Sequence, residues 1–265
     1  MSTALGKGLP FTKASACGND FLIVEGAQVD GDLGDLARRL CDRHNGVGAD
    51  GVEWLYPDAE VDASILLFNA DGSEAEISGN GTRCVAAEIC GQKAKTVVRI
   101  RTAAGIKTCC LIGRHGATFE FETDMGRPIV GNEISVDAGA TRVAGTPVSM
   151  GNPHFVVFVD AFPEAWQEHA ARIQAQPVFP QGTNVEYVVV RGANEIEIRL
   201  FERGVGETQS SGTGSCAAAV AAIASRRVAS PVNVVAPGGA QIVRWDTQVY
   251  LRGPATLVCR GELFL

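Results

Sequence analysis

Two short stretches of small and polar residues could do chemistry on a small anion. They are residues 78–81, with the sequence SGNG, and residues 211–214, with the sequence SGTG. Each follows a strand-like run and a polar loop, and each precedes a run typical of a helix. The first backbone N–H groups of a helix have no partner inside it and carry partial positive charge, and glycine lets a ligand approach them closely. We therefore expect each stretch to bind a carboxylate or phosphate, with a serine hydroxyl beside it.

The spacing of the two serines indicates an internal repeat. Ser78 and Ser211 lie 211 − 78 = 133 positions apart, which is about half of the 265-residue chain. Two related halves would each direct a helix start into one shared cleft. Such a pair could hold one carboxylate and present a side chain to each face of the adjacent carbon, as stereochemical inversion requires. The alternative is two ordinary glycine-rich turns before core helices, which the recurrence at half-chain spacing disfavours.

Other glycine-rich or nucleophile motifs do not fit these stretches. Neither has the G-x-G-x-x-G spacing of a dinucleotide site, and the chain contains no G-x-x-x-x-G-K-[ST]. A nucleophile elbow needs glycine two positions before the serine, whereas Glu76-Ile77 precedes Ser78 and Gln209-Ser210 precedes Ser211. The sequence therefore gives little support to a nucleotide-binding protein or a serine hydrolase.

A scattered set of polar residues could bind a small zwitterion. Asparagine is a common turn residue, so each one alone is more often structural. Together with an acidic and a basic residue at a strand end they form a set of donors and acceptors, and an arginine can bind a carboxylate through two parallel hydrogen bonds. The set comprises Asn19, Asn69, Asn152, Asn184, Glu202 and Arg203. His154 is either an ordinary capping or core histidine or a group that assists proton transfer.

Composition limits the class of protein and its partners. The chain is 46% hydrophobic and 20% charged, which is typical of a folded globular protein. A net charge of −7 argues against nucleic acid as a partner. No apolar run reaches the roughly 18–20 residues of a membrane span, and MSTALGKGLPF lacks the apolar core of a signal peptide, so we expect a cytoplasmic protein without a membrane partner. Eight cysteines show no zinc-ligand spacing, and we expect no metal.

The hydrophobic pattern predicts an α+β fold in two lobes. Helices are expected near residues 32–44, 78–90, 163–173 and 212–227, among many short strands without a regular βαβ alternation. Residues 125–146 are rich in glycine, proline and small residues and have no clear period. We therefore place an N-terminal lobe at residues 1–125 and a C-terminal lobe at residues 126–252, with the tail, about residues 253–265, packing back onto the first lobe.

Several long motifs together resemble the diaminopimelate epimerase family, a group of cofactor-independent amino-acid racemases. They are FNADGSEAEISGNGTRC, GNPHFVVFV, GTNVEYV, ERGVGETQSSGTGSC, CGNDF and HNGVGADG, and they cover nearly the whole chain in order. The resemblance implies two pseudo-symmetric lobes, each a mixed or antiparallel β-structure around a central helix, with the active site in the cleft between them. It also implies conversion of LL-diaminopimelate to the meso form, for lysine and cell-wall synthesis, without pyridoxal phosphate or metal. A small zwitterionic amino acid is the expected partner, and a homodimer is the assembly to test.

The resemblance also assigns roles to individual residues. The asparagines of the set above, with Glu202 and Arg203, would hold the substrate. Backbone N–H groups would bind the reacting carboxylate, and His154 and Glu202 would lie beside an acid/base pair formed by Ser78 and Ser211. The residues that supply those N–H groups are Gly79, Asn80, Gly212 and Thr213.

In this family both positions of the acid/base pair are cysteines, and here both are serines. A thiol has a pKa near 8.5, which a helix start can lower, whereas a serine hydroxyl is a far weaker acid. Three explanations stay open: an engineered double Cys→Ser form, a natural branch whose serines work with His154 or Glu202, or a silent amino-acid-binding or water-eliminating relative. Racemisation of another amino acid and a replacement thiol at Cys17 are further alternatives.

Overall fold

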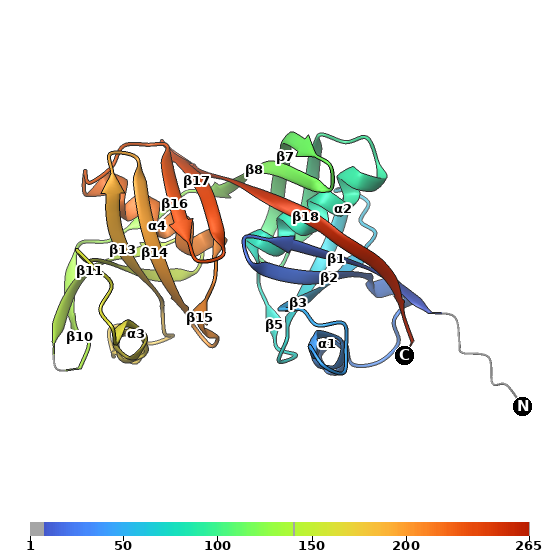
Figure 1. Ribbon diagram of the computed structural model, residues 1–265, viewed down its shortest axis with the longest axis horizontal. Helices are drawn as coiled ribbons and strands as arrows, with labels where there is room; N and C mark the ends of the chain where they lie inside the picture. The colour runs from blue at the N-terminus through green and yellow to red at the C-terminus, as the bar shows by residue number, and fades with distance from the viewer. Residues whose placement is uncertain (1–7, 140, 265) are drawn as a thin grey trace, which may run out of the picture. The chain divides into compact units, whose positions relative to one another are not determined.

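The computed structural model describes residues 8–139 and 141–264, which form two compact units (Figure 1). Unit 1 contains the described residues up to Glu122 and from Pro254 onward, and unit 2 contains Thr123–Gly253. The chain passes from unit 1 to unit 2 within one strand, β8 (Thr118–Gly126), and returns within another, β18 (Val249–Leu263). Each unit is therefore described by itself.

Unit 1 is built on a mixed sheet. Its strands are hydrogen-bonded in the order β7–β6–β4–β3–β2–β1–β18, with parallel pairs at β2–β3 and β4–β6. Each parallel pair is joined by a connection that contains a helix, α1 or α2, as parallel neighbours require. The elements are β1 (Leu9–Ala16), β2 (Asn19–Glu25), a short 3₁₀ helix (Gly26–Gln28), α1 (Leu33–Cys41), β3 (Gly51–Tyr56), β4 (Ala63–Asn69), β5 (Glu74–Ala75), α2 (Gly79–Gln92), β6 (Val97–Thr102) and β7 (Gly105–His115).

Unit 2 has the same plan. Its strands follow the order β9–β11–β12–β13–β14–β16–β17–β18, with parallel pairs at β12–β13 and β14–β16. Helices α3 and α4 lie in the connections between those parallel strands. The elements are β9 (Ile129–Val130), β10 (Ile134–Asp137), β11 (Arg142–Ser149), β12 (Pro153–Phe158), α3 (Trp166–Gln174), β13 (Asn184–Gly192), β14 (Glu195–Glu202), β15 (Gly206–Thr208), α4 (Gly212–Ala224), β16 (Val232–Ala236) and β17 (Gly239–Trp245).

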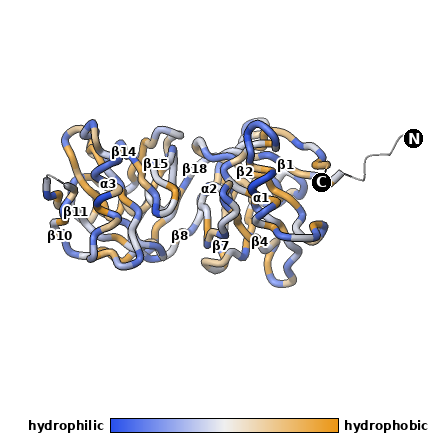
Figure 2. The backbone as a smooth tube through the Cα atoms, turned by 90° about the horizontal axis from the view of Figure 1, so that it is seen from below, coloured by the Kyte–Doolittle hydropathy of each residue, from blue (hydrophilic) through white to orange (hydrophobic). Residues whose placement is uncertain are grey.

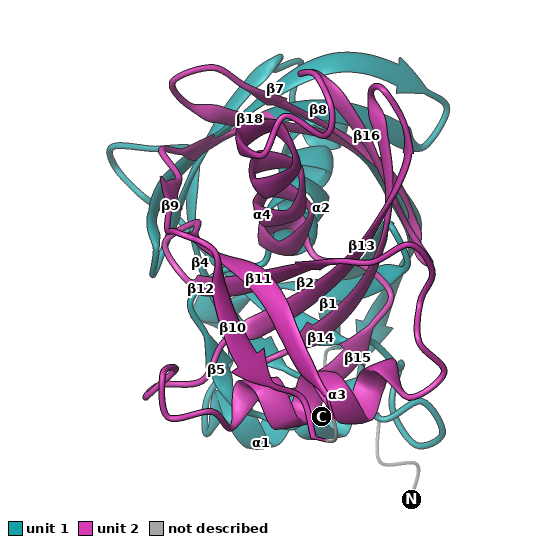
Figure 3. Ribbon diagram, turned by 90° about the vertical axis from the view of Figure 1, so that its left-hand side faces the viewer, with its two compact units in different colours: residues 1–122, 254–265 teal, residues 123–253 magenta. Residues whose placement is uncertain are grey.

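One helix in each unit is buried along most of its length. Helix α2 is buried from Gly79 to Cys90 and contacts β1, β2, β6 and β7. Helix α4 contacts six long strands of its unit and the short strand β9, and in Figure 3 strands of unit 2 pass around it. Its sequence, GTGSCAAAVAAIA, explains how it fits, because alanine combines high helix propensity with a side chain small enough for strands to approach on several sides.

The second helix of each unit packs on the opposite face of the strands. Leu36 and Leu40 of α1 join a core that includes Trp54, and Trp166 and Ile173 of α3 join a corresponding core in unit 2. The remaining faces of α1 and α3 carry hydrophilic residues, which Figure 2 shows as blue stretches. Each unit therefore has two hydrophobic layers, one on either side of its strands.

The two units repeat each other with a constant offset. Helices α1 and α3 begin 133 positions apart, as do α2 and α4, and β1 and β11 correspond at the same offset over their full lengths. The register agrees as well, since the parallel pair Phe21 with Gly51 corresponds to the pair His154 with Asn184. The offset first inferred from two serines thus holds from β1 to α2 without an insertion or deletion.

The structure corrects several details of the predicted elements. Helix α2 continues through Gly91, and residues 125–146 contain β9, β10 and the start of β11 instead of lacking regular structure. Residues 249–263 form one long strand, β18, where only short strands were expected. The connections between parallel strands also show that helices and strands do alternate locally. The predicted lobe boundaries at residues 125 and 252 stay a prediction.

The packing of α4 predicts a strong difference between two alanines of the same helix. Ala218 is fully buried and Ala224 is exposed. We expect Ala218→Leu to lower the free energy of unfolding by about 1–3 kcal/mol, because added methylenes strain a close-packed core. Ala224→Leu should stay within about 0.5 kcal/mol of wild type. Urea unfolding measures both, and equal effects would contradict the buried position of α4.

Candidate functional site

Ser78 and Ser211 are the N-cap residues of the two buried helices. Ser78 Oγ accepts a hydrogen bond of 3.0 Å from the Gly81 N–H, and Ser211 Oγ accepts one of 3.2 Å from the Gly214 N–H. The helices' own bonding begins one residue further on, with Thr82 N–H to Ser78 C=O and Ser215 N–H to Ser211 C=O. Both residues have extended backbone angles, as N-caps do. The predicted helix starts are therefore confirmed at both positions.

In unit 1, a chain of hydrogen bonds fixes the first turn of α2 to the β1–β2 turn. Asn80 Nδ2 donates to Asn19 Oδ1 at 2.7 Å, and Asn19 Nδ2 donates to Asp50 Oδ2 at 3.1 Å. The buried Arg83 donates to Asn80 Oδ1 and to the Gly79 carbonyl oxygen. The amide of Asn19 is thus held at both ends by groups of its own unit.

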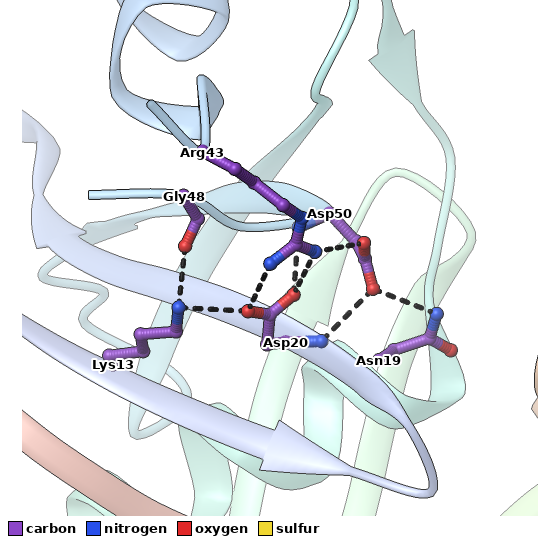
Figure 4. A network of polar contacts seen from close by, with 6 residues as sticks. All are labelled: Lys13, Asn19, Asp20, Arg43, Gly48 and Asp50. Carbon is purple, nitrogen blue, oxygen red and sulfur yellow. Dashed lines mark hydrogen bonds and ion pairs between the residues drawn. The ribbon is translucent and has the colours of Figure 1, made fainter. Parts of the chain in front are cut away.

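An ionic cluster supports Asn19 from behind (Figure 4). Arg43 donates to both Asp20 and Asp50 at 2.8 Å, and Lys13 Nζ lies 2.9 Å from Asp20. Burial opposes ionisation of Asp20, but its hydrogen bonds with Arg43 and Lys13 outweigh this and lower its pKa. Asp20 therefore stays a carboxylate, and the β1–β2 turn that carries Asn19 is held in one orientation.

Asn69 lies at the end of β4, opposite Gly51 of β3. Its side-chain amide donates to Ser73 Oγ at 3.0 Å, and the neighbouring Ala70 N–H donates to the Asp50 carbonyl oxygen. Unit 1 thus brings Asn19, Asn69 and the α2 start to the same end of its strands, with Asp50 between the two asparagines.

In unit 2, Glu202 lies beside Ser211. It is half-buried, it accepts a hydrogen bond from Ser211, and its Oε1 accepts one of 3.1 Å from Thr208 Oγ1. Burial raises the pKa of Glu202, and the nearby carboxyl of Glu186 adds to this, whereas the hydrogen bonds oppose it. Glu202 is therefore a carboxyl group next to the Ser211 hydroxyl whose pKa lies above its usual range.

His154 is buried and holds a hydrogen bond at each ring nitrogen. Nδ1 lies 2.7 Å from Glu186 Oε1 and Nε2 lies 3.0 Å from Asn152 Oδ1. Asn152 Nδ2 donates to Thr213 Oγ1 at 3.3 Å, so Oδ1 is its acceptor and His154 Nε2 must carry a proton. Burial raises the pKa of Glu186, whereas the adjacent His154 lowers it. A chain of hydrogen bonds thus runs from Glu186 to Thr213 in the first turn of α4.

Asn184 links the remaining predicted residues of unit 2. Its Nδ2 donates to the Pro153 carbonyl oxygen at 2.9 Å, and its Oδ1 accepts from the Arg203 backbone N–H at 2.9 Å. The guanidinium of the exposed Arg203 donates to the Gln181 carbonyl oxygen at 2.8 Å and keeps further donors for a ligand. The residues predicted in this half are therefore brought together, around the start of α4.

Four functional groups were missed by the sequence analysis. Asp50 and Arg83 hold the α2 start, and two buried glutamates, Glu53 and Glu186, lie behind the two helix starts. A cationic residue inside an apolar helix and a glutamate inside the strand sequence GVEWL were signals that could have found two of them. Cys17, named as a replacement thiol, is buried against Arg83, and burial raises its pKa, so it is poorly suited to act as a thiolate.

Comparison with known proteins identifies the family. The model of the diaminopimelate epimerase family matches residues 11–130 and 146–258. A diaminopimelate epimerase of Desulforudis audaxviator is 41% identical over 96% of this chain and 99% of its own length. The chain belongs to the diaminopimelate epimerase family. A second family member, from Pelotomaculum thermopropionicum, is 40% identical over 95% of this chain and 98% of its own length.

The fold is shared with solved structures of low sequence identity. The crystal structure of a hydroxyproline epimerase from Agrobacterium vitis with bound trans-4-hydroxy-L-proline matches 99% of this chain and 92% of its own, with a TM-score of 0.72 at 16% identity. At this identity the likeness concerns the fold alone. No helix within residues 8–139 and 141–264 is long and apolar enough to cross a membrane.

The cap geometry predicts how much each serine contributes to folding. We expect Ser78→Ala and Ser211→Ala each to lower the free energy of unfolding by about 1 kcal/mol, because each leaves one N–H of the first turn without its acceptor. Ser225→Ala, at the exposed C-terminal end of α4, should change it by less than about 0.5 kcal/mol. Urea unfolding of the three variants tests this, and no loss from the first two would mean that the hydroxyls do not cap.

The buried carboxyl of Glu53 should make the free energy of unfolding depend on pH. Burial raises its pKa from about 4.5 to about 8. Between these values the unfolded chain ionises Glu53 and the folded protein does not, so stability falls as pH rises through this range and falls no further above it. Relative to Glu53→Gln, wild type should lose a few kcal/mol between pH 5 and pH 8, at about 1.4 kcal/mol per pKa unit. Substitution of an exposed glutamate, Glu76→Gln, is the control. If stability depends on pH in the same way in wild type and in Glu53→Gln, Glu53 is not a buried neutral acid.

Proposed function

We propose that this protein is a diaminopimelate epimerase that inverts the α-carbon of LL-diaminopimelate to give the meso form. One observation supports this most directly: the same serine-capped, glycine-rich helix start stands at corresponding positions of both repeats. A reaction that removes a proton from one face of a carbon and adds one to the other needs two such groups. The full-length relationship to the family supplies the substrate class.

The two helix starts would act on a single amino-acid centre. Backbone N–H groups of Gly79, Asn80, Gly212 and Thr213 would hold the reacting carboxylate, which makes the adjacent C–H bond more acidic by stabilising the developing negative charge. One serine Oγ takes the α-proton as its own hydroxyl proton passes to a neighbouring carboxylate, and the carbon retains the electron pair. The other serine then donates its hydroxyl proton to the opposite face and regains a proton from a neighbouring carboxyl group.

This proposal requires a particular arrangement of the chain. Two pseudo-symmetric lobes, each a β-structure around its buried helix, would face each other with the site in the cleft between them. The lobes would be residues 1–125 with the tail from about 253, and residues 126–252. The proposal is supported by the fact that Ser78 and Ser211 belong to different units.

The remaining polar residues would bind the rest of the zwitterion. Arg203 and Glu202 offer a cation for a carboxylate and an anion for an ammonium group, and Asn69 and Asn184 add amide donors and acceptors. Asn19 and Asn152 would contribute mainly by orientation, since their side-chain amides are engaged within their own units. His154 would act through Asn152 on the α4 start.

Serine in place of a thiol lowers the rate more than the affinity. Size and hydrogen bonding are nearly the same, whereas the hydroxyl is a weaker acid and needs a neighbouring carboxyl to take its proton. Glu202 offers such a carboxyl to Ser211. A cytoplasmic, cofactor-independent homodimer stays a prediction.

The decisive test is hydrogen exchange at the α-carbon. Incubation of LL-diaminopimelate with the protein in D₂O should place deuterium at the α-position and yield the meso form, as followed by NMR. The double variant Ser78→Cys plus Ser211→Cys should exchange at least about 100-fold faster, because a thiol at a helix start ionises near neutral pH. Each single variant should gain less, since both faces must react.

Matched controls separate the alternatives. Ser225→Cys, at the other end of α4, should leave the exchange rate unchanged. Stabilisation of the protein against heat by diaminopimelate without any exchange, in wild type and in the double cysteine variant alike, would replace the epimerase by an amino-acid-binding protein. An unchanged rate in an active double variant would show that residues 78 and 211 are not the acid/base pair.

A further inference from the structure

Glu53 is a fully buried carboxyl group without a hydrogen-bond partner. Its exposed fraction is 0%, and neither of its two side-chain oxygens is bonded to any other described residue. An unbonded polar atom in the interior costs free energy, and an ionised carboxyl there costs far more. Because the burial of Glu53 lowers stability, we looked for a function of its carboxyl group.

The carboxyl of Glu53 is directed at the first turn of α2. A Cβ on Gly81 would overlap Glu53 Oε1, and the same Cβ would stand 3.3 Å from Ser78 Cβ. The N–H of Gly81 also donates the capping hydrogen bond to Ser78 Oγ. Glu53 and Ser78 therefore adjoin the same glycine, whose missing side chain leaves room for the carboxyl.

The other surroundings of Glu53 are apolar or already paired. Its strand neighbours are Ile23 on β2 and Leu67 on β4. From α2 the thiol of Cys84 faces it, and that thiol is kept neutral because burial raises its pKa. The charged residue of this turn, Arg83, is engaged with Asn80 and the Gly79 carbonyl oxygen.

The repeat shows that this carboxyl has a counterpart at the other helix start. Glu186 lies 133 positions after Glu53 at the same register, and its Oε1 is 3.0 Å from a Cβ placed on Gly214. There the carboxyl is bonded to His154, whereas the corresponding residue of unit 1 is Phe21. Asn69 likewise corresponds to Glu202. Within its own repeat, Ser78 thus lacks the histidine and the second carboxyl that surround Ser211.

We propose that Glu53 is the proton-holding partner of Ser78, a buried positioning residue that acts on the substrate only through the serine hydroxyl. This inference rests on the proposed epimerase function and deepens it. Each serine then has a carboxyl partner, Glu202 for Ser211 and Glu53 for Ser78. The proposal also explains why the carboxyl of Glu53 is buried without a hydrogen bond.

The proton transfer is balanced within these groups and the substrate. When Ser78 reprotonates the α-carbon, its O–H bond breaks and the electron pair of the carbanion forms the C–H bond. The Glu53 O–H bond breaks in turn, its proton restores the Ser78 hydroxyl, and Glu53 is left as a carboxylate. The reverse reaction moves both protons back. The neutral acid needed for the forward step is the form that burial favours, since the pKa of Glu53 is raised to about 8.

Glu53→Gln tests the inference, because glutamine keeps the shape of the side chain but exchanges no proton. In wild type, the rate should fall as pH rises through about 8, where Glu53 loses its proton. The variant should lose about 100-fold in kcat with little change in KM, and its rate should no longer fall there. The control is Glu88→Gln. Glu88 is a buried carboxyl on α2, ten positions past Ser78, and it accepts a hydrogen bond from Thr12. This variant should keep the wild-type rate and pH profile.

A second measurement does not depend on turnover. In protein carrying ¹³C at the glutamate carboxyls, the Glu53 signal, assigned by its loss in Glu53→Gln, should titrate near pH 8. Ser78→Ala should shift that titration, and Ser211→Ala should not. An unaltered kcat and pH profile in Glu53→Gln, or a titration indifferent to Ser78→Ala, would overturn the inference. A different result would refute the epimerase function and not this inference. In that case wild type exchanges no α-hydrogen of any substrate, but Ser78→Ala still shifts the Glu53 titration.

Discussion

The need to satisfy the first N–H groups of a buried helix underlies the rest of this structure. Helices α2 and α4 are enclosed where water cannot serve as a general partner, so their first turns must be capped by the protein or by a ligand. Each serine supplies one acceptor, and the two glycines that follow it allow a ligand to approach the remaining N–H groups closely. The feature that stabilises the helix is therefore the same feature that prepares it to bind a carboxylate.

The two repeats have kept one backbone plan while their chemistry has diverged. Around Ser211 the plan carries Glu202, His154 and Glu186, which form a polar environment. Around Ser78 the corresponding positions carry Asn69, Phe21 and Glu53, so a neutral amide and an apolar ring leave one isolated acid. The two helix starts therefore share one backbone plan but differ in the charge and polarity of the residues around them.

Much of the plan could be predicted from sequence, because its signals are local. Serine before two spaced glycines is an N-cap signal, and both helices begin where it occurs. The spacing of Leu36 and Leu40 likewise located α1. Contacts between distant residues were not predictable in this way. The bond between Asn80 and Asn19 joins residues 61 positions apart, and Glu53 is buried against Gly81 in the first turn of α2, far along the chain. The resemblance to a family supplied candidate roles, but only the structure identified the carboxyls behind the helix starts.

The long strand β18 has a consequence for the order in which the protein matures on the ribosome. Its first part pairs with β17, and its later part pairs with β1, where Ala255 and Leu263 enter hydrophobic clusters of unit 1. The Pro254 carbonyl oxygen also accepts a bond from the buried Arg83. The half that is synthesised first is therefore completed last. During translation, Arg83 and the open edge at β1 lack their partners until the chain extends through Leu263. Unit 2 is continuous in sequence, so it can fold earlier.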